Sequence, residues 1–283
     1  MSLYDMLVQR RSVRNFTDQE IPEEVIAQLL EAANNAPSGG NIQPVSIITV
    51  QEAENRKRLS ALVGHQPWVK NAPLSMIFCL DFQRVKRWAA MKETEFKGEQ
   101  ALAQFLIAYA DVICAAQTVL ILAESLGLGS VYVGSVNGTF SETREAFSIP
   151  EFVLPVMVLS LGYPKSIPQD IPKFTPDVIV HHERYQTRSD AEIAQIFKDK
   201  YGDFSDDDTY LKKAFVETVE ADQQDEMGWM EMALEAMKKM EIRNNAQFLF
   251  NLRYPADQMV QMNQHLMDAM SAAGFHWPAE KKE

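Results

Sequence analysis

The chain has 283 residues, of which 46% are hydrophobic and 23% are charged, a composition typical of a globular protein with a sizeable core. The formal net charge of −12 argues against nucleic acid or an anionic membrane as the main partner. Two distant cysteines, Cys79 and Cys114, make neither a metal cage nor an iron–sulfur site. We interpret them as reduced core thiols of a cytoplasmic protein, because the first residues lack the apolar segment of a signal peptide.

Amphipathic patterns predict two helices at the start of the chain. The first covers residues 2–11, where Ser2 stands at the N-cap position and the apolar residues share one face. The second begins at Pro22, a residue that suits the first helical position, and ends before Pro37.

Four apolar runs have the length and composition of β-strands. They cover residues 45–50, 74–80, 131–136 and 154–161. Helical segments separate these runs, so the pattern alone predicts a layered architecture of the α+β or α/β class.

The most apolar part of the chain is a long predicted helix at residues 99–126. It is apolar nearly all round, so we expect it to be buried either within the core or against a partner subunit. Gly127 ends it, as glycines commonly end helices. Asp111 and Glu124 interrupt the apolar run, which favours a core helix over a membrane span.

After residue 186 the sequence becomes acidic, rich in methionine and helical in pattern. Amphipathic helices are predicted at residues 192–201, 210–220, 227–240 and 256–273. We therefore divide the chain into a core, residues 1–188, and a helical extension, residues 189–283. The apolar faces of these helices need burial, so we expect the extension to cross onto a partner subunit.

Three arginines and a serine lie close together in the basic segment, residues 10–16: Arg10, Arg11, Ser12 and Arg14. Guanidinium groups are planar forks of donors, and in an acidic protein such a cluster could hold a phosphate dianion. The alternative is a solvated basic helix end, where cations offset the helix dipole.

A second candidate binding segment, which we name the glycine turn, spans residues 36–44 between a predicted helix and a predicted strand. Its two glycines let the backbone approach a flat ligand closely. Asn41 and Gln43 offer donors and acceptors for the edge of a heterocycle. The alternative is an ordinary helix-to-strand turn, which uses the same residue types.

Other chemical signals are weak. Residues 127–135 are rich in glycine but do not form a dinucleotide-binding fingerprint. The pair His181–His182 lacks a suitably spaced carboxylate or cysteine, so we expect no metal site. No nucleophile motif is present, and the catalytic residue stays unassigned.

In their order and spacing these segments resemble the nitroreductase superfamily, and within it the flavin reductase and oxygen-insensitive nitroreductase group. The basic segment resembles the family's phosphate motif, and the glycine turn resembles its flavin-edge motif. Residues 64–69 are similar to its glutamine-bearing turn, and residues 131–134 to the loop beside the flavin. The resemblance covers residues 1–188 and implies an α+β fold, with a central, mostly antiparallel sheet flanked by helices.

The resemblance also implies an FMN site that is shared between the two subunits of a homodimer. The implied cofactor contacts are Arg10, Arg11, Ser12, Arg14 and Lys173 at the phosphate, Gln66 and Trp68 at the ribityl chain or ring, Tyr132, Val133, Gly134 and Ser135 along the ring, and Pro37, Ser38, Gly39 and Asn41 at the isoalloxazine from the second subunit.

The implied activity is electron transfer from NADH or NADPH to nitroaromatic, quinone or flavin acceptors by a ping-pong mechanism. FMN carries the difficult step in such chemistry, so no acid–base dyad is needed. The alternatives are a same-fold flavoenzyme, such as a reductive dehalogenase or a dehydrogenase, and a non-enzymatic flavin-binding protein. For the extension, residues 189–283, we expect one of two roles: it forms part of the wall over the open face of the flavin, or it is a structural arm that strengthens the dimer.

Overall fold

The computed structural model describes residues 2–166, 168–205 and 226–277. These residues belong to two compact units, Met1–Pro168 with Met262–Glu283, and Gln169–Gln261. The expected helix at 210–220 lies outside the described residues. The division of the chain at residue 188 stays a prediction.

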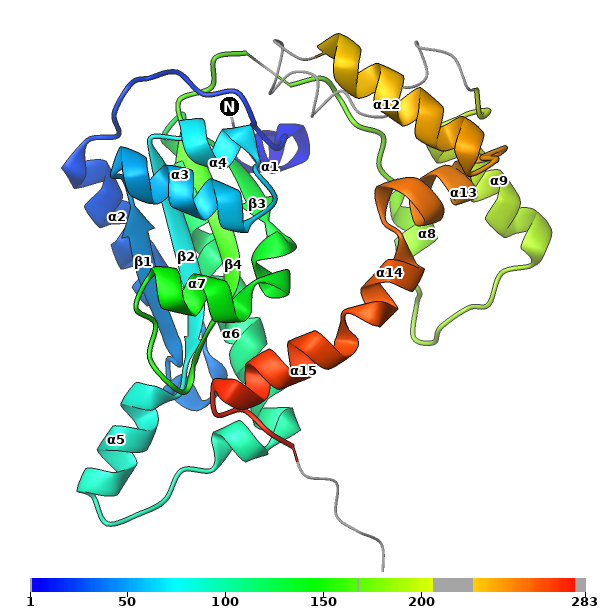
Figure 1. Cartoon of the computed structure of the whole chain (residues 1–283). Coiled ribbons are helices and arrows are strands. Elements are labelled where there is room, and N and C mark those ends of the chain that lie inside the picture. Colours follow the sequence, from blue (N-terminus) through cyan, green and yellow to red (C-terminus); the bar gives the residue numbers. More distant parts are fainter. Residues whose placement is uncertain (1, 167, 206–225, 278–283) are drawn as a thin grey trace, which may run out of the picture. The chain divides into compact units, whose positions relative to one another are not determined.

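The first unit is built on a four-stranded sheet with the order β1-β2-β4-β3, in which every neighbouring pair is antiparallel (Figure 1). The strands are β1 (Val45–Val50), β2 (Leu74–Asp81), β3 (Gly129–Val133) and β4 (Val153–Gly162). All eight residues of β2 are buried, as expected for a central strand that is covered on both faces. The α+β fold class expected from the sequence is therefore confirmed.

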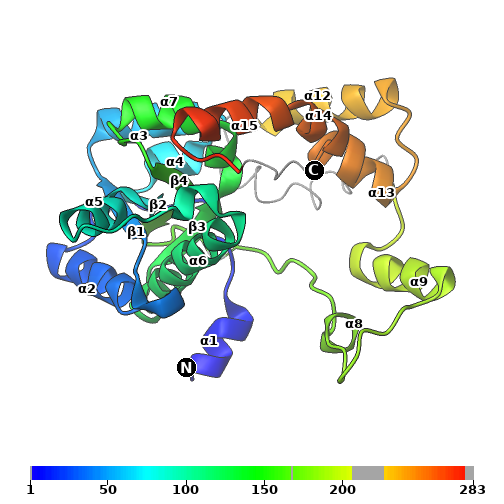
Figure 2. The ribbon, with the colours of Figure 1, turned by 90° about the horizontal axis from the view of Figure 1, so that it is seen from below.

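Helices cover both faces of this sheet, as Figure 2 shows. On one face lie α2 (Glu23–Asn34) and α6 (Leu102–Ser125), and on the other lie α3 (Ala53–Leu62), α4 (Pro67–Asn71) and α7 (Phe140–Ala146). Short 3-10 turns, η1 (Gly39–Asn41), η2 (Gly98–Gln100) and η3 (Gly134–Gly138), join elements, and α5 (Gln83–Met91) follows β2. The strand expected at 131–136 ends at Val133, because η3 begins at the next residue.

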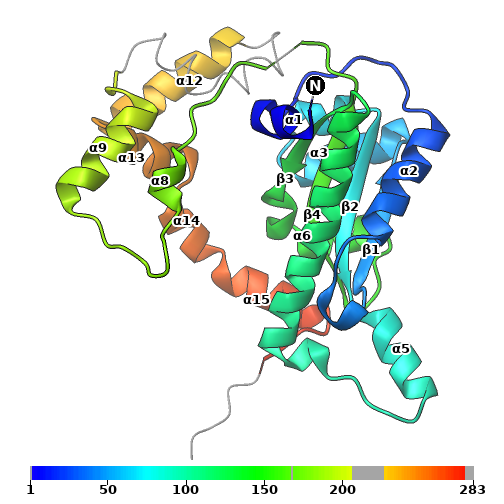
Figure 3. The same ribbon diagram turned by 180° about the vertical axis from the view of Figure 1, so that it is seen from behind.

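The helix α6 crosses the sheet, and α1 (Leu3–Gln9) lies beside one end of it (Figure 3). The side of α6 that faces the sheet is buried, for example at Val112 and Val119. The opposite side leaves Leu106 58% exposed, so a single chain does not bury the helix all round. By length and composition α6 could also cross a membrane, but core helices of soluble proteins pass the same test.

The two cysteines have different surroundings. Cys79 is fully buried in β2, where burial raises the pKa of its thiol to about 12. Cys114 is exposed on α6, so the expectation of two core thiols is wrong for this residue. Both cysteines are free.

The end of the described chain returns to the core of the first unit. After α15 (Asn263–Ala272), Phe275 is only 1% exposed and its ring lies 5.8 Å from that of Phe82. The His276 N–H donates to the Glu99 carbonyl at 3.2 Å. The expectation that the whole extension crosses onto a partner is therefore wrong for residues 263–277, because their apolar side chains complete their own core.

The second unit is helical. It contains α8 (Pro176–Ile179), α9 (Asp190–Tyr201), α12 (Glu226–Lys239), α13 (Asn245–Gln247), the π-helix η4 (Phe248–Arg253) and α14 (Ala256–Gln261). Ser189 and Glu192 form a capping box that begins α9. The buried apolar cluster of this second unit consists of Met237, Ile242 and Phe248. The continuous helix expected at 256–273 is instead two helices, α14 and α15.

Candidate functional site

The basic segment follows α1 and runs along the edge of β3. The Val13 N–H donates to the Ser130 carbonyl at 2.9 Å, and Ser12 forms an isolated parallel bridge with Ser130. Val13 is buried, and its side chain requires glycine at position 129, since a Cβ there would lie 2.5 Å from the Val13 Cγ2. The segment is therefore fixed against the sheet edge while its arginines project from a defined backbone.

The arginines of this segment make different contacts. The Arg11 Nη1 donates to the Val8 carbonyl at 3.2 Å and to the Arg10 carbonyl at 2.9 Å. This contact matches the helix-end alternative, because it satisfies carbonyls that α1 leaves open. The Arg14 guanidinium lies over the Trp68 ring, 5.3 Å from its centroid. Arg14 thus connects the basic segment to α4.

Arg10 lies near two half-buried acidic groups. Burial raises the pKa of Tyr132 above its usual value, and the Arg10 charge opposes this shift. Burial likewise raises the pKa of Glu124, again against the attraction of Arg10. The Tyr132 hydroxyl donates to the Gln117 Oε1 at 3.3 Å. Tyr132 is therefore a neutral hydroxyl at physiological pH, directed toward α6.

Gln66 and Ser135 are brought together although they are 69 residues apart in sequence. The Gln66 Nε2 donates to the Ser135 Oγ at 3.1 Å and to the Val63 carbonyl at 2.9 Å. The Ser135 Oγ donates to the same carbonyl at 2.9 Å. Val133 is buried, whereas Gly134 is exposed and a Cβ there would meet nothing within 4 Å. The loop after β3 therefore presents open backbone beside a fixed glutamine.

The glycine turn lies against α6 rather than at this loop. The Gly39 N–H donates to the Asp111 Oδ1 at 3.0 Å, and Ile107 packs so closely that a Cβ on Gly39 would lie 2.6 Å from its Cγ2. Asn41 is exposed and has the left-handed backbone conformation, with φ of 55°. A pocket of about 300 Å³ opens beside the turn, with Pro37 and Ser38 among its lining residues.

Three of the sequence-predicted segments therefore meet around β3. They are joined by the bridge of Ser12 with Ser130, by Arg14 over Trp68 and by the bond of Gln66 with Ser135. Lys173 is exposed and belongs to the second unit. Its role at the phosphate stays a prediction.

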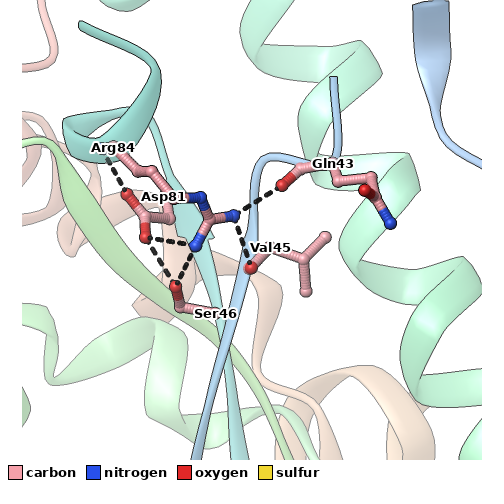
Figure 4. Close-up of polar contacts among 5 residues, drawn as sticks. All are labelled: Gln43, Val45, Ser46, Asp81 and Arg84. Atoms are coloured by element: carbon pink, nitrogen blue, oxygen red, sulfur yellow. Dashed lines mark hydrogen bonds and ion pairs between the residues drawn. The ribbon is translucent and has the colours of Figure 1, made fainter. Parts of the chain in front are cut away.

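Sequence reasoning missed two charged residues that hold the glycine turn. Asp111 was interpreted only as an interruption of an apolar helix, yet it is 8% exposed and accepts a backbone N–H. Arg84 donates to the Gln43 and Val45 carbonyls, as Figure 4 shows. The sequence did contain a signal for Asp111: it is a lone carboxylate within an apolar helix, and a buried charge needs a hydrogen-bond partner. Among the described residues, no group of three or more His, Cys, Asp or Glu is arranged to hold a metal ion.

Comparison with known proteins identifies the class to which this fold and site belong. The model of the Nitroreductase family matches residues 7–163, which is more than half of the chain. The chain belongs to the nitroreductase family.

Individual relatives agree with this assignment. A Bacillus subtilis protein named FMN reductase (NAD(P)H) is 37% identical over 182 residues, covering 63% of this chain and 72% of the relative. A Salmonella typhimurium protein named oxygen-insensitive NADPH nitroreductase is 31% identical over 192 residues, covering 68% and 78%. The solved structure of B. megaterium NfrA2 has a TM-score of 0.75 and 26% identity, covering 99% of this chain and 100% of that chain. The expected family and the expected class of enzyme, an oxidoreductase, are confirmed.

Proposed function

We propose that the chain is an FMN-dependent oxidoreductase that takes hydride from NADH or NADPH and reduces nitroaromatic, quinone or flavin acceptors in a ping-pong cycle. The observation that carries the proposal is the meeting of the basic segment, Gln66 and the open loop at Gly134 around β3. The names of the relatives, FMN reductase and NADPH nitroreductase, support the same chemistry.

The chemistry of the donors fits a flavin mononucleotide. Arg10, Ser12 and Arg14 supply guanidinium and hydroxyl donors on one fixed segment, which suits a terminal phosphate dianion. The glycine-rich residues 127–135 lack the dinucleotide fingerprint, so the sequence provides for one phosphate rather than two. The empty space at Gly134 allows a flat ring to approach the backbone.

Each segment has a distinct task in this proposal. The arginines would bind the phosphate, and Gln66, whose amide is held by Val63 and Ser135, would contact the ribityl chain or ring. The loop after β3 offers backbone N–H groups to the ring edge. FMN supplies the hydride chemistry, accepting two electrons from the nicotinamide and passing them on. Ping-pong kinetics follow when donor and acceptor occupy the same face of the ring in turn.

We also propose that the active form is a homodimer. The helices α1 and α6 expose large apolar side chains, namely Leu3, Tyr4, Leu7, Val8, Leu102, Leu106 and Ile107, which are 44–73% exposed. Apolar surface of this kind marks an interaction site, and a two-fold dimer buries the same surface on both subunits. The glycine turn packs on the same helix, at Ile107 and Asp111, so dimerisation would carry it toward the flavin of the partner.

The test of the proposed activity is steady-state oxidation of NADH and NADPH with a quinone and with a nitroarene as acceptor. The expected double-reciprocal plots are parallel lines, because the donor product leaves before the acceptor binds. Intersecting lines would contradict the ping-pong cycle. Absence of turnover with either donor would contradict the oxidoreductase itself.

A further inference from the structure

The glycine turn has an unfavourable backbone conformation. Gly40, Asn41 and Gln43 have φ of 59°, 55° and 51°. Left-handed backbone costs little at glycine but is uncommon at a residue such as glutamine. Such conformations persist only where surrounding contacts fix them, and they are concentrated at ligand sites. Two charged residues, Asp111 and Arg84, supply such contacts to this turn.

Asp111 holds the first end of the turn. Its carboxylate is 8% exposed on α6, and its Oδ1 accepts the Gly39 N–H at 3.0 Å. The backbone can come this close to the helix only because residue 39 is glycine, since a Cβ would meet Ile107 at 2.6 Å. A buried carboxylate without a donor would be costly, so the pairing fixes both groups.

Arg84, the second residue of α5, holds the other end of the turn (Figure 4). Its Nη2 donates to the Gln43 carbonyl at 2.8 Å and to the Val45 carbonyl at 3.1 Å. Its Nη1 lies 3.4 Å from the Ser46 Oγ and 3.5 Å from the Asp81 Oδ2. One guanidinium nitrogen therefore binds two backbone carbonyls while the other lies against Ser46 and Asp81, an arrangement that the single nitrogen of a lysine cannot reproduce in full.

Gln43 itself is fixed at all of its backbone polar groups and at its side-chain amide. Its N–H donates to the Ser38 Oγ at 3.2 Å, and its Nε2 donates to the Asn34 carbonyl at 2.9 Å. Its carbonyl accepts from Arg84. The pocket of about 300 Å³ is lined by Ser38, Gln43, Arg84 and Asp111. The two charged residues that hold the turn, Asp111 and Arg84, which we call the clamps, therefore border one concave surface.

We propose that Asp111 and Arg84 are positioning residues that hold residues 39–43 in place, with Gly40, Asn41 and Gln43 in the left-handed conformation, so that the turn is presented to the flavin. They act through the backbone of the turn, and the ligand that benefits is the isoalloxazine of FMN. The inference rests on the proposed function, which supplies the flavin.

The test compares Arg84→Lys with Arg87→Lys, a matched exposed arginine one helical turn further along α5, and Asp111→Leu with Asp111→Asn. The apparent Kd for FMN is measured by fluorescence titration, together with the visible absorption spectrum of the bound flavin. Arg84→Lys and Asp111→Leu should each raise the Kd for FMN about tenfold and shift the flavin spectrum. Each variant removes hydrogen bonds to a charged group, and their free energy corresponds to about a tenfold change in affinity. Asp111→Asn retains an acceptor oxygen and Arg87→Lys alters no clamp, so both should stay within about twofold of the parent chain.

A second readout needs no flavin. Hydrogen exchange at the Gly39 amide should accelerate in Asp111→Leu, and exchange at the Gln43 amide should accelerate in Arg84→Lys, while Arg87→Lys leaves both unchanged. Thermal unfolding identifies any variant that does not fold, and if Asp111→Leu fails to fold, Arg84→Lys decides the question.

Unchanged FMN affinity and spectrum in folded Arg84→Lys and Asp111→Leu would overturn the inference, even if both variants melt at a lower temperature. If the parent chain fails to bind FMN, the proposed function is wrong. The exchange rates at Gly39 and Gln43 then still show whether the two charges fix the turn.

Discussion

At the scale of single residues, Arg14 separates the binding interpretation of the basic segment from the helix-end alternative. Arg11 donates to the carbonyls at the end of α1, as that alternative expects. Arg14 instead lies over the Trp68 ring, away from the helix end. Contact with the ring favours one position of the guanidinium, whose planar set of donors suits recognition of a phosphate.

We expect Arg14→Ala to weaken FMN binding by about 1.5–3 kcal/mol, roughly 10- to 150-fold, because it removes one charged donor from a dianion. The measurement is a fluorescence titration of the flavin. Arg87→Ala, an exposed arginine on α5, is the control and should leave the affinity unchanged. A change of less than about twofold in Arg14→Ala would favour the helix-end interpretation instead.

At the scale of elements, an ion pair connects α5 with η2, the turn before α6. The Lys86 Nζ donates to the Glu99 Oε1 at 2.5 Å, and the Glu99 side chain is only 4% exposed. Burial alone would raise the pKa of Glu99. Hydrogen bonds, chiefly from Lys86, outweigh this effect, so the pKa of Glu99 lies below its ordinary value. The Glu99 backbone carbonyl separately accepts the His276 N–H, so the same residue contacts both α5 and the segment that carries Phe275.

Lys86→Met should lower the free energy of unfolding by about 3 kcal/mol at neutral pH, since it leaves a buried carboxylate without its cation. Because the folded pKa of Glu99 lies below its ordinary value of 4.5, its contribution is present above that value and is lost as the pH falls through the lowered pKa. The difference between parent and variant should therefore shrink in acid. Urea denaturation at neutral and acidic pH measures this difference, with Lys92→Met as the exposed control. Equal midpoints at neutral pH would refute the role of the pair.

The sequence predicted the elements whose pattern is local. Apolar runs identified the four strands of the sheet, and an apolar face behind an N-cap serine, Ser2, identified α1. The end of β3 was misplaced because the β-branched pattern continues past Val133, whereas Gly134 starts a 3-10 turn. The helix α3 was not among the predicted elements, since it buries only a narrow face that includes Leu59.

The candidate site divides in the same way. Composition marked the basic segment and the glycine turn as candidates with structural alternatives, whereas the family resemblance marked Gln66 and the loop after β3. The sequence offered a signal that Asp111 needs a partner, but the partners of Asp111 and Arg84 were not predictable, because Asp111 and Gly39 are 72 residues apart, and Arg84 and Gln43 are 41 apart. Which distant groups meet depends on how α6 and α5 pack, and periodicity within one segment carries no such information.

At the scale of the whole molecule, the exposed side of α6 is the observation on which the proposed homodimer rests. Leu102, Leu106 and Ile107 are 51%, 58% and 47% exposed in a single chain, although the helix is apolar along its length. Leu106→Lys should therefore raise the dimer dissociation constant about 30-fold or more, because it places a charge in a buried apolar interface. Sedimentation equilibrium measures this change.

The control for that experiment is Trp88→Lys, which replaces an exposed aromatic residue on α5. It should leave the dimer intact. Loss of the dimer in Leu106→Lys should also weaken FMN binding, since the glycine turn is proposed to reach the partner's flavin. A monomeric parent chain at micromolar concentration would contradict the shared site.

The most direct test of the central claim is anaerobic stopped-flow mixing of the FMN-loaded protein with NADH and with NADPH. We predict that the visible absorbance of the flavin bleaches in a single turnover with at least one of the two donors, and that a quinone or nitroarene added afterwards restores it. The result that would contradict an FMN-dependent NAD(P)H oxidoreductase is a bound flavin that neither donor reduces faster than free FMN under the same conditions.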